Sequence, residues 1–485
     1  MQENIKGLYA AFKAKDARFD GRFFVGISST GIYCRPVCKA RQPKAENCTF
    51  FRTAAAAEQA GYRPCLLCRP ELAPGTSVTD ATADLVYRAA RMLERNCGSG
   101  QSLREIAERL GCTDRHLRRI FTAEYHVSPV QYLQTCRLLL AKNLLTDTDL
   151  SVLEVAMAAG FGSLRRFNDL FKKHYQLVPT ALRKRQAEAK SHNGEITLAL
   201  GYRPPYAWDK ILKFLAGRAI TGIEVVNNDE YLRTVKLQNA EGQQFCGWVR
   251  VGHRPVENTL SVTVSESLLP VLPEVLARIK NLFDLYCEPE AVYETLQVMN
   301  TLQPGLCVLG TRLPGCFNVF EMSVRAVLGQ QITVKAASTL AARLAAYGTQ
   351  VQTGIGGLTH SFPAPAAILA LGENISGHLG KLGIISARAN TIYQLARVLA
   401  DEKNDFGFCG NPEEEMQKLQ SIRGIGSWTA QYIAMRAMGW PDAFLPTDAG
   451  IKKALPDHTP KELQALSEAW RPWRSYATVN LWNTL

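Results

Sequence analysis

The hydrophobic and polar positions along the chain divide it into four blocks of different periodicity. Residues 1–75 are rich in arginine, cysteine and aromatic residues, and residues 80–187 carry apolar positions at helical spacing almost throughout. After a polar joint at 191–195, the segments IEVVNNDEYLRTVKLQ and TLSVTVSES alternate as β-strands do. From about residue 287 the spacing is helical again to the end, apart from a loop near 348–361. The pattern predicts a multidomain α+β protein.

The second block contains an internal repeat of fifty residues. Phe121 and Tyr125 recur as Phe171 and Tyr175, and each copy follows a Ser-x-x-Glu capping box, a short helix and a glycine turn. This order predicts two helix-turn-helix units. A plain helical bundle would have the same apolar spacing, but basic positions on the second helices favour DNA binding. These positions include Arg115, Arg118, Arg119, Arg165 and Arg166.

The net charge of +12 belongs to the first part of the chain. Residues 1–190 hold 30 Lys and Arg against 18 Asp and Glu, whereas residues 191–485 hold 26 of each. A basic first part fits binding to a polyanion, of which nucleic acid is the commonest. A solvated basic surface is the alternative that charge alone leaves open.

The thirteen cysteines are too sparse for a disulfide scaffold. The chain has neither a signal-peptide core nor an 18-residue apolar run, so we expect a reducing cytosol and neither export nor membrane insertion. Clustered cysteines are then metal ligands or nucleophiles. One cluster exists, Cys34-x-x-x-Cys38 with Cys65-x-x-Cys68, at the spacing of a tetrahedral Zn²⁺ site.

Two roles fit this zinc site. It can be a structural staple for a small domain, or it can be reactive, because four thiolates on Zn²⁺ leave a charge of −2 and keep the sulfurs nucleophilic. The stretches GRFFVGISSTGIYCRPVCKAR and GYRPCLLCRP resemble the N-terminal domain of the Ada alkylation-response proteins over about residues 3–72. The resemblance implies that Cys34 accepts the methyl group of a DNA methylphosphotriester once per molecule, while Cys38, Cys65 and Cys68 complete the zinc shell.

The following block resembles the AraC-type DNA-binding domain that comes next in Ada proteins. The resemblances imply a zinc methyl-acceptor domain at 1–77 and an all-α double helix-turn-helix domain at 78–187. Ada proteins also carry a domain with a Pro-Cys-His-Arg motif that removes methyl groups from guanine oxygen. That motif does not occur in this chain, so we expect this activity to be absent.

The C-terminal block contains a helix-hairpin-helix pattern. In LQSIRGIGSWTAQYIAMRAMG (419–439), Gly424 and Gly426 predict a tight hairpin, and the free N–H groups of the second helix can bind a phosphate. The segment FLPTD (444–448) then places a carboxylate behind the hairpin. A G-x-G hairpin alone is common in ordinary turns, so the combination carries the prediction.

Together with YRPPYAWDKILKFLAGRA, RLPGCFNVFEMSVRAVLGQQIT and RPWRSYA, these segments resemble the AlkA type of 3-methyladenine DNA glycosylase from about residue 195 to the end. The resemblance implies a β-rich AlkA-like N-terminal domain at 194–286 and an all-α helix-hairpin-helix glycosylase domain at 287–485. It makes Asp448 the catalytic residue and puts Gln331 at the position of the apolar wedge. The aromatic residues of the base pocket are Trp428, Tyr432 and Trp482. The backbone carbonyls that hold a hairpin cation, a candidate monovalent ion, are those of Gln420, Ile422 and Ile425.

Elementary chemistry agrees with these roles. An alkylated purine is cationic, so its bond to the sugar is weak and a carboxylate can stabilise the oxocarbenium-like transition state. Aromatic faces favour a cationic base by about 1–2 kcal/mol, and the base must be flipped out of the duplex to reach them. Enzymes of this group that also cut the strand place a lysine where this chain has Trp428, so we expect a monofunctional glycosylase.

The sequence therefore predicts a bacterial protein that accepts methyl groups from DNA, activates transcription and excises alkylated bases. The alternative is a transcription regulator whose glycosylase-like half binds DNA with weak catalysis. The expected partner is double-stranded DNA, with RNA polymerase as a candidate. We expect a monomer in the cytoplasm, associated with the nucleoid.

Overall fold

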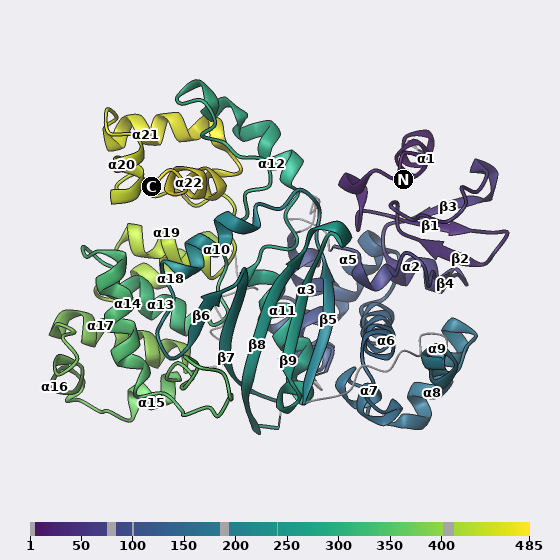
Figure 1. Ribbon diagram of the computed structural model, residues 1–485, viewed down its shortest axis with the longest axis horizontal. Coiled ribbons are helices and arrows are strands. Elements are labelled where there is room, and N and C mark those ends of the chain that lie inside the picture. Colours follow the sequence, from purple (N-terminus) through teal and green to yellow (C-terminus); the bar gives the residue numbers. More distant parts are fainter. Residues whose placement is uncertain (1–4, 75–83, 99–100, 185–193, 240, 401–411) are drawn as a thin grey trace. The chain divides into compact units, whose positions relative to one another are not determined.

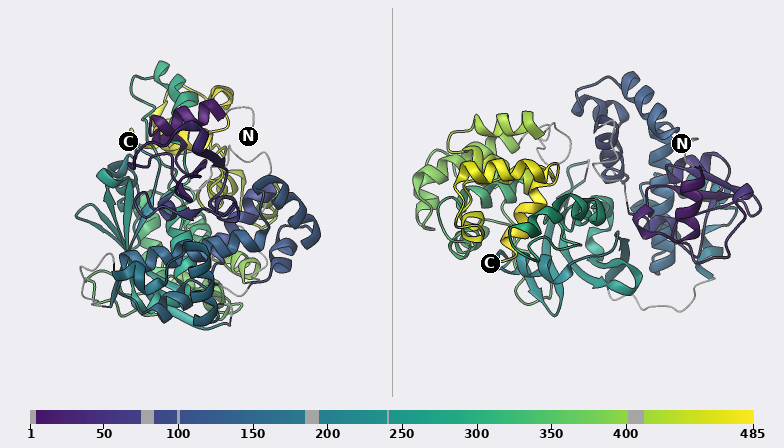
Figure 2. Two further views of the ribbon diagram at one scale, coloured as in Figure 1. Left: turned by 90° about the vertical axis from the view of Figure 1, so that its right-hand side faces the viewer. Right: turned by 90° about the horizontal axis from the view of Figure 1, so that it is seen from above.

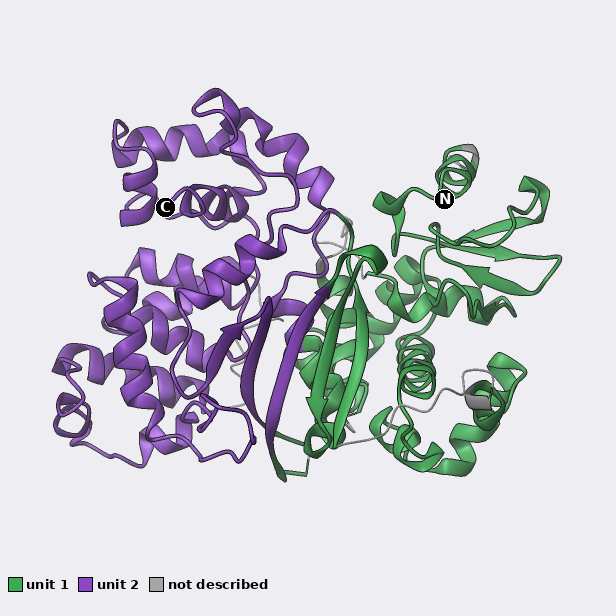
Figure 3. Ribbon diagram, in the orientation of Figure 1, with its two compact units in different colours: residues 1–204, 237–245, 254–277 green, residues 205–236, 246–253, 278–485 purple. Residues whose placement is uncertain are grey.

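The computed structural model describes residues 5–74, 84–98, 101–184, 194–239, 241–400 and 412–485. The chain forms two compact units (Figure 3). The first comprises residues 1–204, 237–245 and 254–277, and the second comprises residues 205–236, 246–253 and 278–485. Among the described residues, no helix has the length and apolar character needed to cross a membrane.

The N-terminal part of the first unit is a small sheet between helices (Figure 1). Its strand order is β3-β1-β2-β4, with β1 antiparallel to both neighbours and β4 parallel to β2. Successive side chains of a strand point to opposite faces, so Val25 packs in one apolar cluster with Phe12, and Phe24 packs in another with Ala57. The elements are α1 (Ile5–Lys13), β1 (Phe24–Ile27), β2 (Ile32–Cys34), β3 (Cys48–Phe51), α2 (Ala54–Gln59) and β4 (Arg63–Pro64).

The next helices of the first unit form the two predicted helix-turn-helix units. Both predicted capping boxes are present, at the starts of α4 and α7. The second helix of each unit, α5 or α8, ends at a residue in the left-handed conformation, His126 or Gln176. The repeat thus extends to the helix ends. The helices are α3 (Asp84–Arg95), α4 (Leu103–Arg109), α5 (Asp114–Tyr125), α6 (Pro129–Asp147), α7 (Val152–Ala158), α8 (Leu164–Tyr175) and α9 (Pro179–Lys184).

The β-rich block that the sequence predicts forms a five-stranded sheet of order β5-β9-β8-β7-β6, in which the two alternating segments supply β6, β7 and β9 (Figure 1). Strand β5 is antiparallel to β9 along its whole length, and β6 is antiparallel to β7. The strands are β5 (Glu195–Gly201), β6 (Glu224–Asn227), β7 (Glu230–Gln238), β8 (Gln244–Arg254) and β9 (Thr259–Ser265). Helix α10 (Trp208–Ala216) follows β5, and helix α11 (Leu272–Leu282) follows β9.

The rest of the second unit is helical. In the right-hand view of Figure 2, the C-terminal helices (yellow) lie against the green helices, and α13 contacts both α17 and α19. Two apolar clusters make up this part, and Tyr432 on α19 packs against both. The helices are α12 (Pro289–Leu296), α13 (Val319–Leu328), α14 (Val334–Ala345), α15 (Pro365–Leu369), α16 (Ile375–Gly380), α17 (Ser386–Leu399), α18 (Pro412–Gln420), α19 (Ser427–Arg436), α20 (Ala449–Ala454), α21 (Pro460–Ser467) and α22 (Arg474–Trp482).

Candidate functional sites

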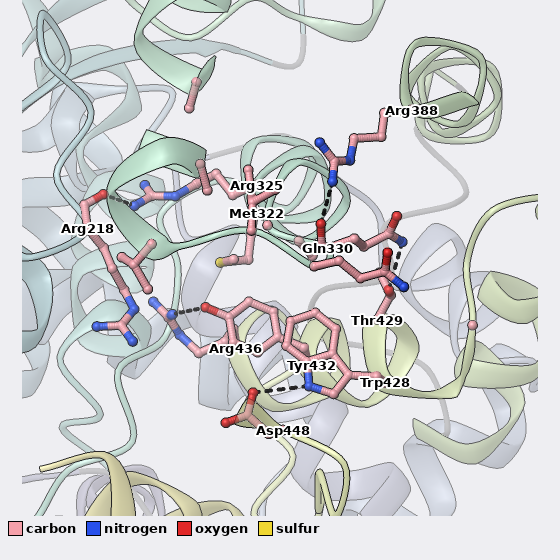
Figure 4. A pocket seen from close by; sticks show the side chains of 18 of the residues that line it. Arg218, Met322, Arg325, Gln330, Arg388, Trp428, Thr429, Tyr432, Arg436 and Asp448 are labelled. Atoms are coloured by element: carbon pink, nitrogen blue, oxygen red, sulfur yellow. Dashed lines mark hydrogen bonds between the residues drawn. The ribbon is translucent and has the colours of Figure 1, made fainter. Parts of the chain in front are cut away.

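A cleft of about 2160 Å³ opens in the second unit where the two apolar clusters meet (Figure 4). Helices α10, α13, α14, α17, α19, α20 and α22 and the hairpin before α19 contribute to its walls. The cleft brings together most of the glycosylase residues that the sequence predicts. These are Gln331, Ile422, Gly424, Gly426, Trp428, Tyr432, Asp448 and Trp482.

The carboxylate of Asp448 is held by four N–H groups. Its Oδ1 accepts hydrogen bonds from the backbone of Gly450 (2.9 Å) and Ile451 (3.1 Å), because Asp448 caps the N-terminus of α20. Oδ1 also accepts from Nε1 of Trp482 (2.9 Å), and Oδ2 accepts from Nε1 of Trp428 (3.1 Å). These hydrogen bonds therefore hold both indole rings in a fixed position relative to the carboxylate.

Aromatic rings line the cleft beside this carboxylate. Trp428 and Tyr432 are one helical turn apart on α19 and stack with centroids 5.2 Å apart and planes 7° apart. Trp482 lies 6.1 Å from Tyr432 and stacks on Phe214 of α10 at 5.9 Å. The three predicted rings thus form one site, which Phe214 extends.

Three arginines surround Tyr432 at this end of the cleft, and none of them was predicted. Arg436 donates to the Tyr432 hydroxyl (2.9 Å; Figure 4). The guanidinium of Arg218 lies 3.7 Å from the Phe214 ring centroid. The third is Arg325, which pairs with carboxylates outside the cleft lining. Burial raises the pKa of Tyr432, but these three positive charges outweigh burial and leave that pKa below its usual value.

The hairpin glycines have different roles. Gly424 has a φ of +95°, and a Cβ there would lie 2.1 Å from Oγ1 of Thr391. The fold of the turn therefore requires Gly424. A Cβ on Gly426 would meet no atom within 4 Å, so its bare backbone is open to an approaching ligand.

The backbone carbonyls that the sequence predicts as cation ligands belong to the same hairpin. Gln420 ends α18, and the side chains of Ile422 and Ile425 are buried, which holds the hairpin backbone in place. The carbonyl of Ile422 accepts a hydrogen bond from the N–H of Ile425 (3.0 Å). A role for these carbonyls in cation binding stays a prediction.

Gln331 is exposed at the cleft, in the turn between α13 and α14, with a φ of +55°. This conformation is uncommon for a residue with a side chain. Its neighbour Gln330 holds the turn, because Nε2 of Gln330 donates to the carbonyl of Gly424 (2.9 Å) and to Oγ1 of Thr429 (3.0 Å). The turn that carries Gln331 is therefore tied to the hairpin.

The four predicted zinc ligands converge in the first unit. Cys34 ends β2, and Cys65 and Cys68 follow β4, the parallel neighbour of β2. The four Sγ atoms, including that of Cys38, lie within 4.8 Å of one another. A tetrahedron with Zn–S bonds of about 2.3 Å has S···S edges of about 3.8 Å, so the donor set fits one Zn²⁺.

The sulfurs already interact as one cluster. Hydrogen bonding with Cys38 raises the pKa of Cys34, whereas hydrogen bonding with Cys34 lowers the pKa of Cys65. The backbone N–H of Arg35 donates to Sγ of Cys68 (3.4 Å), and Nε of Arg35 donates to Asp20 (2.9 Å). Arg35 thus braces the site while its charge is offset by Asp20.

A buried carboxylate connects the zinc-binding part to the helix-turn-helix part of the first unit. Glu58 on α2 accepts from the hydroxyl of Tyr33 (3.0 Å), next to Cys34, and from that of Thr135 on α6 (2.9 Å). His174 on α8 lies 3.6 Å from the same carboxylate. Burial raises the pKa of Glu58 to about 7. The sequence carried no signal for this residue, which sits in the alanine-rich segment AAAAEQ.

The predicted DNA-binding arginines are exposed. On α5 they are Arg115, Arg118 and Arg119, and on α8 they are Arg165 and Arg166. Arg118 pairs with Asp114 (3.0 Å) on the helix surface, where such a pair contributes little to stability. Both helices therefore present basic side chains to solvent.

Fold and sites define a DNA-binding protein that carries a thiolate metal centre, paired helix-turn-helix units and a glycosylase-type cleft. Family models agree. The metal binding domain of Ada matches residues 7–71, a helix-turn-helix domain matches residues 106–185, and the AlkA N-terminal domain matches residues 197–318.

Similar proteins cover the whole chain. The probable bifunctional transcriptional activator/DNA repair enzyme AlkA of Mycobacterium tuberculosis is 37% identical over 100% of this chain and 97% of its own length. DNA-3-methyladenine glycosylase 2 of Escherichia coli is 36% identical over 59% of this chain and 96% of its own length. The transcriptional activator/DNA repair enzyme Ada of the same species is 35% identical over 26% of this chain and 34% of its own length. The chain belongs to the family of bifunctional transcriptional activator/DNA repair enzymes.

Proposed function

We propose that this protein senses and repairs alkylated DNA through three activities on one chain. It excises alkylated purines of the 3-methyladenine type, accepts methyl groups from DNA methylphosphotriesters on Cys34, and activates transcription through its helix-turn-helix units. The names of its relatives, which combine activator and repair functions, support this assignment. The domain limits that we propose for these parts are 1–77, 78–187, 194–286 and 287–485.

The observation that carries the glycosylase assignment is the carboxylate of Asp448 bonded to two indoles that line the cleft. A flipped base stacks on the rings of Trp428, Tyr432 and Trp482. The C1′–N bond breaks with its electron pair moving to the base, Asp448 stabilises the positive sugar, and water adds at C1′. Oδ2 accepts one hydrogen bond where Oδ1 accepts three, so Oδ2 has more capacity toward the sugar.

The released product is a free base and an intact strand with an abasic site. Strand cleavage by this group of enzymes needs an amine that forms a Schiff base with the sugar. Position 428 in the cleft is a tryptophan, whose indole N–H donates to Asp448 and has no nucleophilic lone pair. Gly426, the hairpin carbonyls of Gln420, Ile422 and Ile425 with a monovalent cation, and Gln331 as the wedge engage the DNA strand around the flipped base.

Methyl transfer uses the zinc-binding part. Zn²⁺ held by Cys34, Cys38, Cys65 and Cys68 keeps the sulfurs as thiolates. The Cys34 sulfur forms a bond to the methyl carbon, and the carbon–oxygen bond breaks with its electron pair leaving on the phosphodiester. The thioether product is stable, so each molecule acts once.

The partners follow from these activities. Arginines on both α5 and α8 give one chain two DNA-recognition helices, so we propose that it works as a monomer on double-stranded DNA and recruits RNA polymerase. We also propose that it works in the cytoplasm with the nucleoid, where its DNA substrate lies. Light scattering of the protein on promoter DNA tests the stoichiometry, and two chains per site would contradict it.

One assay tests the repair functions together. The protein is incubated with methylated DNA, and released bases and protein-bound methyl groups are both counted. We expect Asp448→Asn to lose base release and keep methyl transfer, and Asp457→Asn, an exposed aspartate, to lose neither. Methyl transfer without base release in the unmodified protein would favour the alternative, a regulator with a weak glycosylase half.

A further inference from the structure

Basic side chains outnumber acidic ones in the lining of the glycosylase cleft. Among the described residues that line it, Asp448 alone is acidic, whereas six residues are basic. Exposed cations at the cleft mouth suit DNA phosphates, but two arginines lie deeper, against the aromatic rings. These are Arg218, half-buried, and Arg436, which is 4% exposed.

Neither of these two arginines is neutralised by an acid. Among the described residues, no carboxylate lies within ion-pair distance of Arg218 or Arg436. Arg436 donates to the carbonyls of Pro314 and Gly315 (3.0 Å for the latter), and Arg218 donates to the carbonyl of Phe214 (3.4 Å). Burial lowers the pKa of Arg218, the Tyr432 hydroxyl raises it, and the charges of Arg436 and Arg325 lower it again, so the pKa lies below its usual value.

The aromatic faces that could attract a cationic base are already in contact with these guanidinium groups. Arg218 lies 3.7 Å from the ring centroid of Phe214 and 5.7 Å from that of Trp482. Arg436 lies 4.7 Å from Phe214 and 5.7 Å from Tyr432. The expectation that these faces are tuned to a cationic base therefore holds only in part, because Arg218 and Arg436 repel such a base.

We propose that Arg218, supported by Arg436, is a specificity-determining residue that stabilises electron density on the departing base and extends excision to neutral purine lesions. This inference rests on the proposed glycosylase function. A neutral base that bears a ring carbonyl leaves as an anion, because the electron pair of the C1′–N bond stays on it. It later takes a proton from water, while a second water adds to the sugar. A cationic base leaves neutral.

The two lesion classes respond differently to loss of the charge. In both, one unit of charge moves from base to sugar, so Arg218 accelerates the chemical step for both. A cationic base is also repelled on binding, and this repulsion offsets the gain. Removal of the charge thus lowers the ratio of maximal rate to half-saturating concentration for a neutral base, and leaves that ratio nearly unchanged for a cationic base.

The test uses the full-length protein in single-turnover assays with two probes. Hypoxanthine in a duplex is the neutral probe, and 7-methylguanine is the cationic probe. For Arg218→Met we expect the ratio of the maximal rate to the half-saturating concentration to fall by about ten- to a hundredfold with hypoxanthine. With 7-methylguanine this ratio should fall by less than about threefold, and the maximal rate should be slower with both probes. Arg218→Lys, which keeps the charge, retains most of the hypoxanthine activity.

Lys213→Met is the matched control, since Lys213 is an exposed cation of α10 that also lines the cleft. We expect it to affect both probes equally and weakly. Equal losses with both probes in Arg218→Met would assign Arg218 to phosphate binding and overturn the proposal. Release of 7-methylguanine but no hypoxanthine by the unmodified protein would also overturn it. Failure to release either probe would instead contradict the glycosylase function itself.

Discussion

Replacing Asp448 by asparagine removes the one acidic side chain of the described cleft lining and keeps the shape of the side chain. Oδ1 of Asp448 caps α20 by accepting from Gly450 and Ile451, and asparagine caps helices about as well as aspartate. The amide oxygen therefore stays with these donors, and the NH2 group faces Nε1–H of Trp428. Two donors then meet, which costs about 1.5–3 kcal/mol relative to the charge-assisted hydrogen bond.

The missing charge has the larger effect on catalysis. A carboxylate about 4 Å from a unit positive charge, at an effective dielectric constant of about 20, contributes about 4 kcal/mol, or about a thousandfold in rate. We expect Asp448→Asn to slow single-turnover release of 7-methylguanine by about a hundred- to a thousandfold. Its melting temperature should fall by about 10 °C at most, because the helix cap is kept and only the contact with Trp428 is lost.

Trp428→Phe separates the charge from the hydrogen bond. Phenylalanine keeps an aromatic ring in the cleft but removes the N–H that Oδ2 of Asp448 accepts. We expect this variant to lose about ten- to a hundredfold in rate, less than Asp448→Asn. Equal losses in the two variants would show that the hydrogen bond positions the site and that the charge contributes nothing, which would refute the catalytic role of Asp448.

Three further outcomes are expected. Borohydride should trap no covalent protein–DNA adduct on alkylated DNA, because position 428 holds no amine; a trapped adduct would contradict this. Methylation of Cys34 should tighten promoter binding at fixed salt by about tenfold to a few hundredfold, because the zinc site changes from −2 to −1 near phosphates; a titration with equal affinities would exclude such a switch. Burial raises the pKa of Glu58 to about 7 from 4.5, so the folded state holds its proton more tightly and stability falls as pH rises between these values. Glu58→Gln should remove this dependence, which amounts to about 3 kcal/mol at most in the free energy of unfolding above pH 7. The test measures the free energy of unfolding of the first unit at pH 5.5 and pH 8, and an unchanged pH dependence would assign the titration to another group.

Much of the glycosylase cleft could be predicted because its chemistry lies in compact segments. Asp448 and the aromatic residues Trp428, Tyr432 and Trp482 belong to motifs that keep their order along the chain, and the structure brings them together. The zinc ligands were predictable for the same reason. Each cysteine pair is close in sequence, so the pairing of two strands is enough to bring all four cysteines together. Composition and periodicity likewise predicted both helix-turn-helix units.

The arginines of the cleft were missed because no motif contains them together. Arg218 and Arg436 lie far apart in sequence, among many other arginines. A usable signal did exist, because each lies four residues after an aromatic residue, Phe214 and Tyr432 respectively. Such spacing predicts a local cation–π pair, but only the contact between Arg436 and the Phe214 ring shows that the two pairs share one cavity.

The two hairpin glycines illustrate a different limit. The sequence predicted that both allow DNA to approach, and Gly424 and Gly426 look equivalent within RGIGSW. The packing of Thr391, which is distant in sequence, makes Gly424 a requirement of the turn and leaves Gly426 as the open position. A side chain from another helix decides the role, so local sequence could not.

One indole ring of the cleft lies near both an acidic and a basic side chain. Nε1 of Trp482 donates to Asp448, and the guanidinium of Arg218 lies 5.7 Å from the centroid of the same ring. A base stacked on Trp482, with its sugar at Asp448, would therefore lie near the negative charge at its sugar and near the positive charge of Arg218. Such a field favours electron flow from sugar to base whatever the initial charge of the base, so chemistry alone selects poorly among lesions. Selection must then occur earlier, when the base binds, because Arg218 repels a cationic base there and accepts a neutral one. We propose that the exposed Gln331 and the open backbone at Gly426 contribute by engaging the strand.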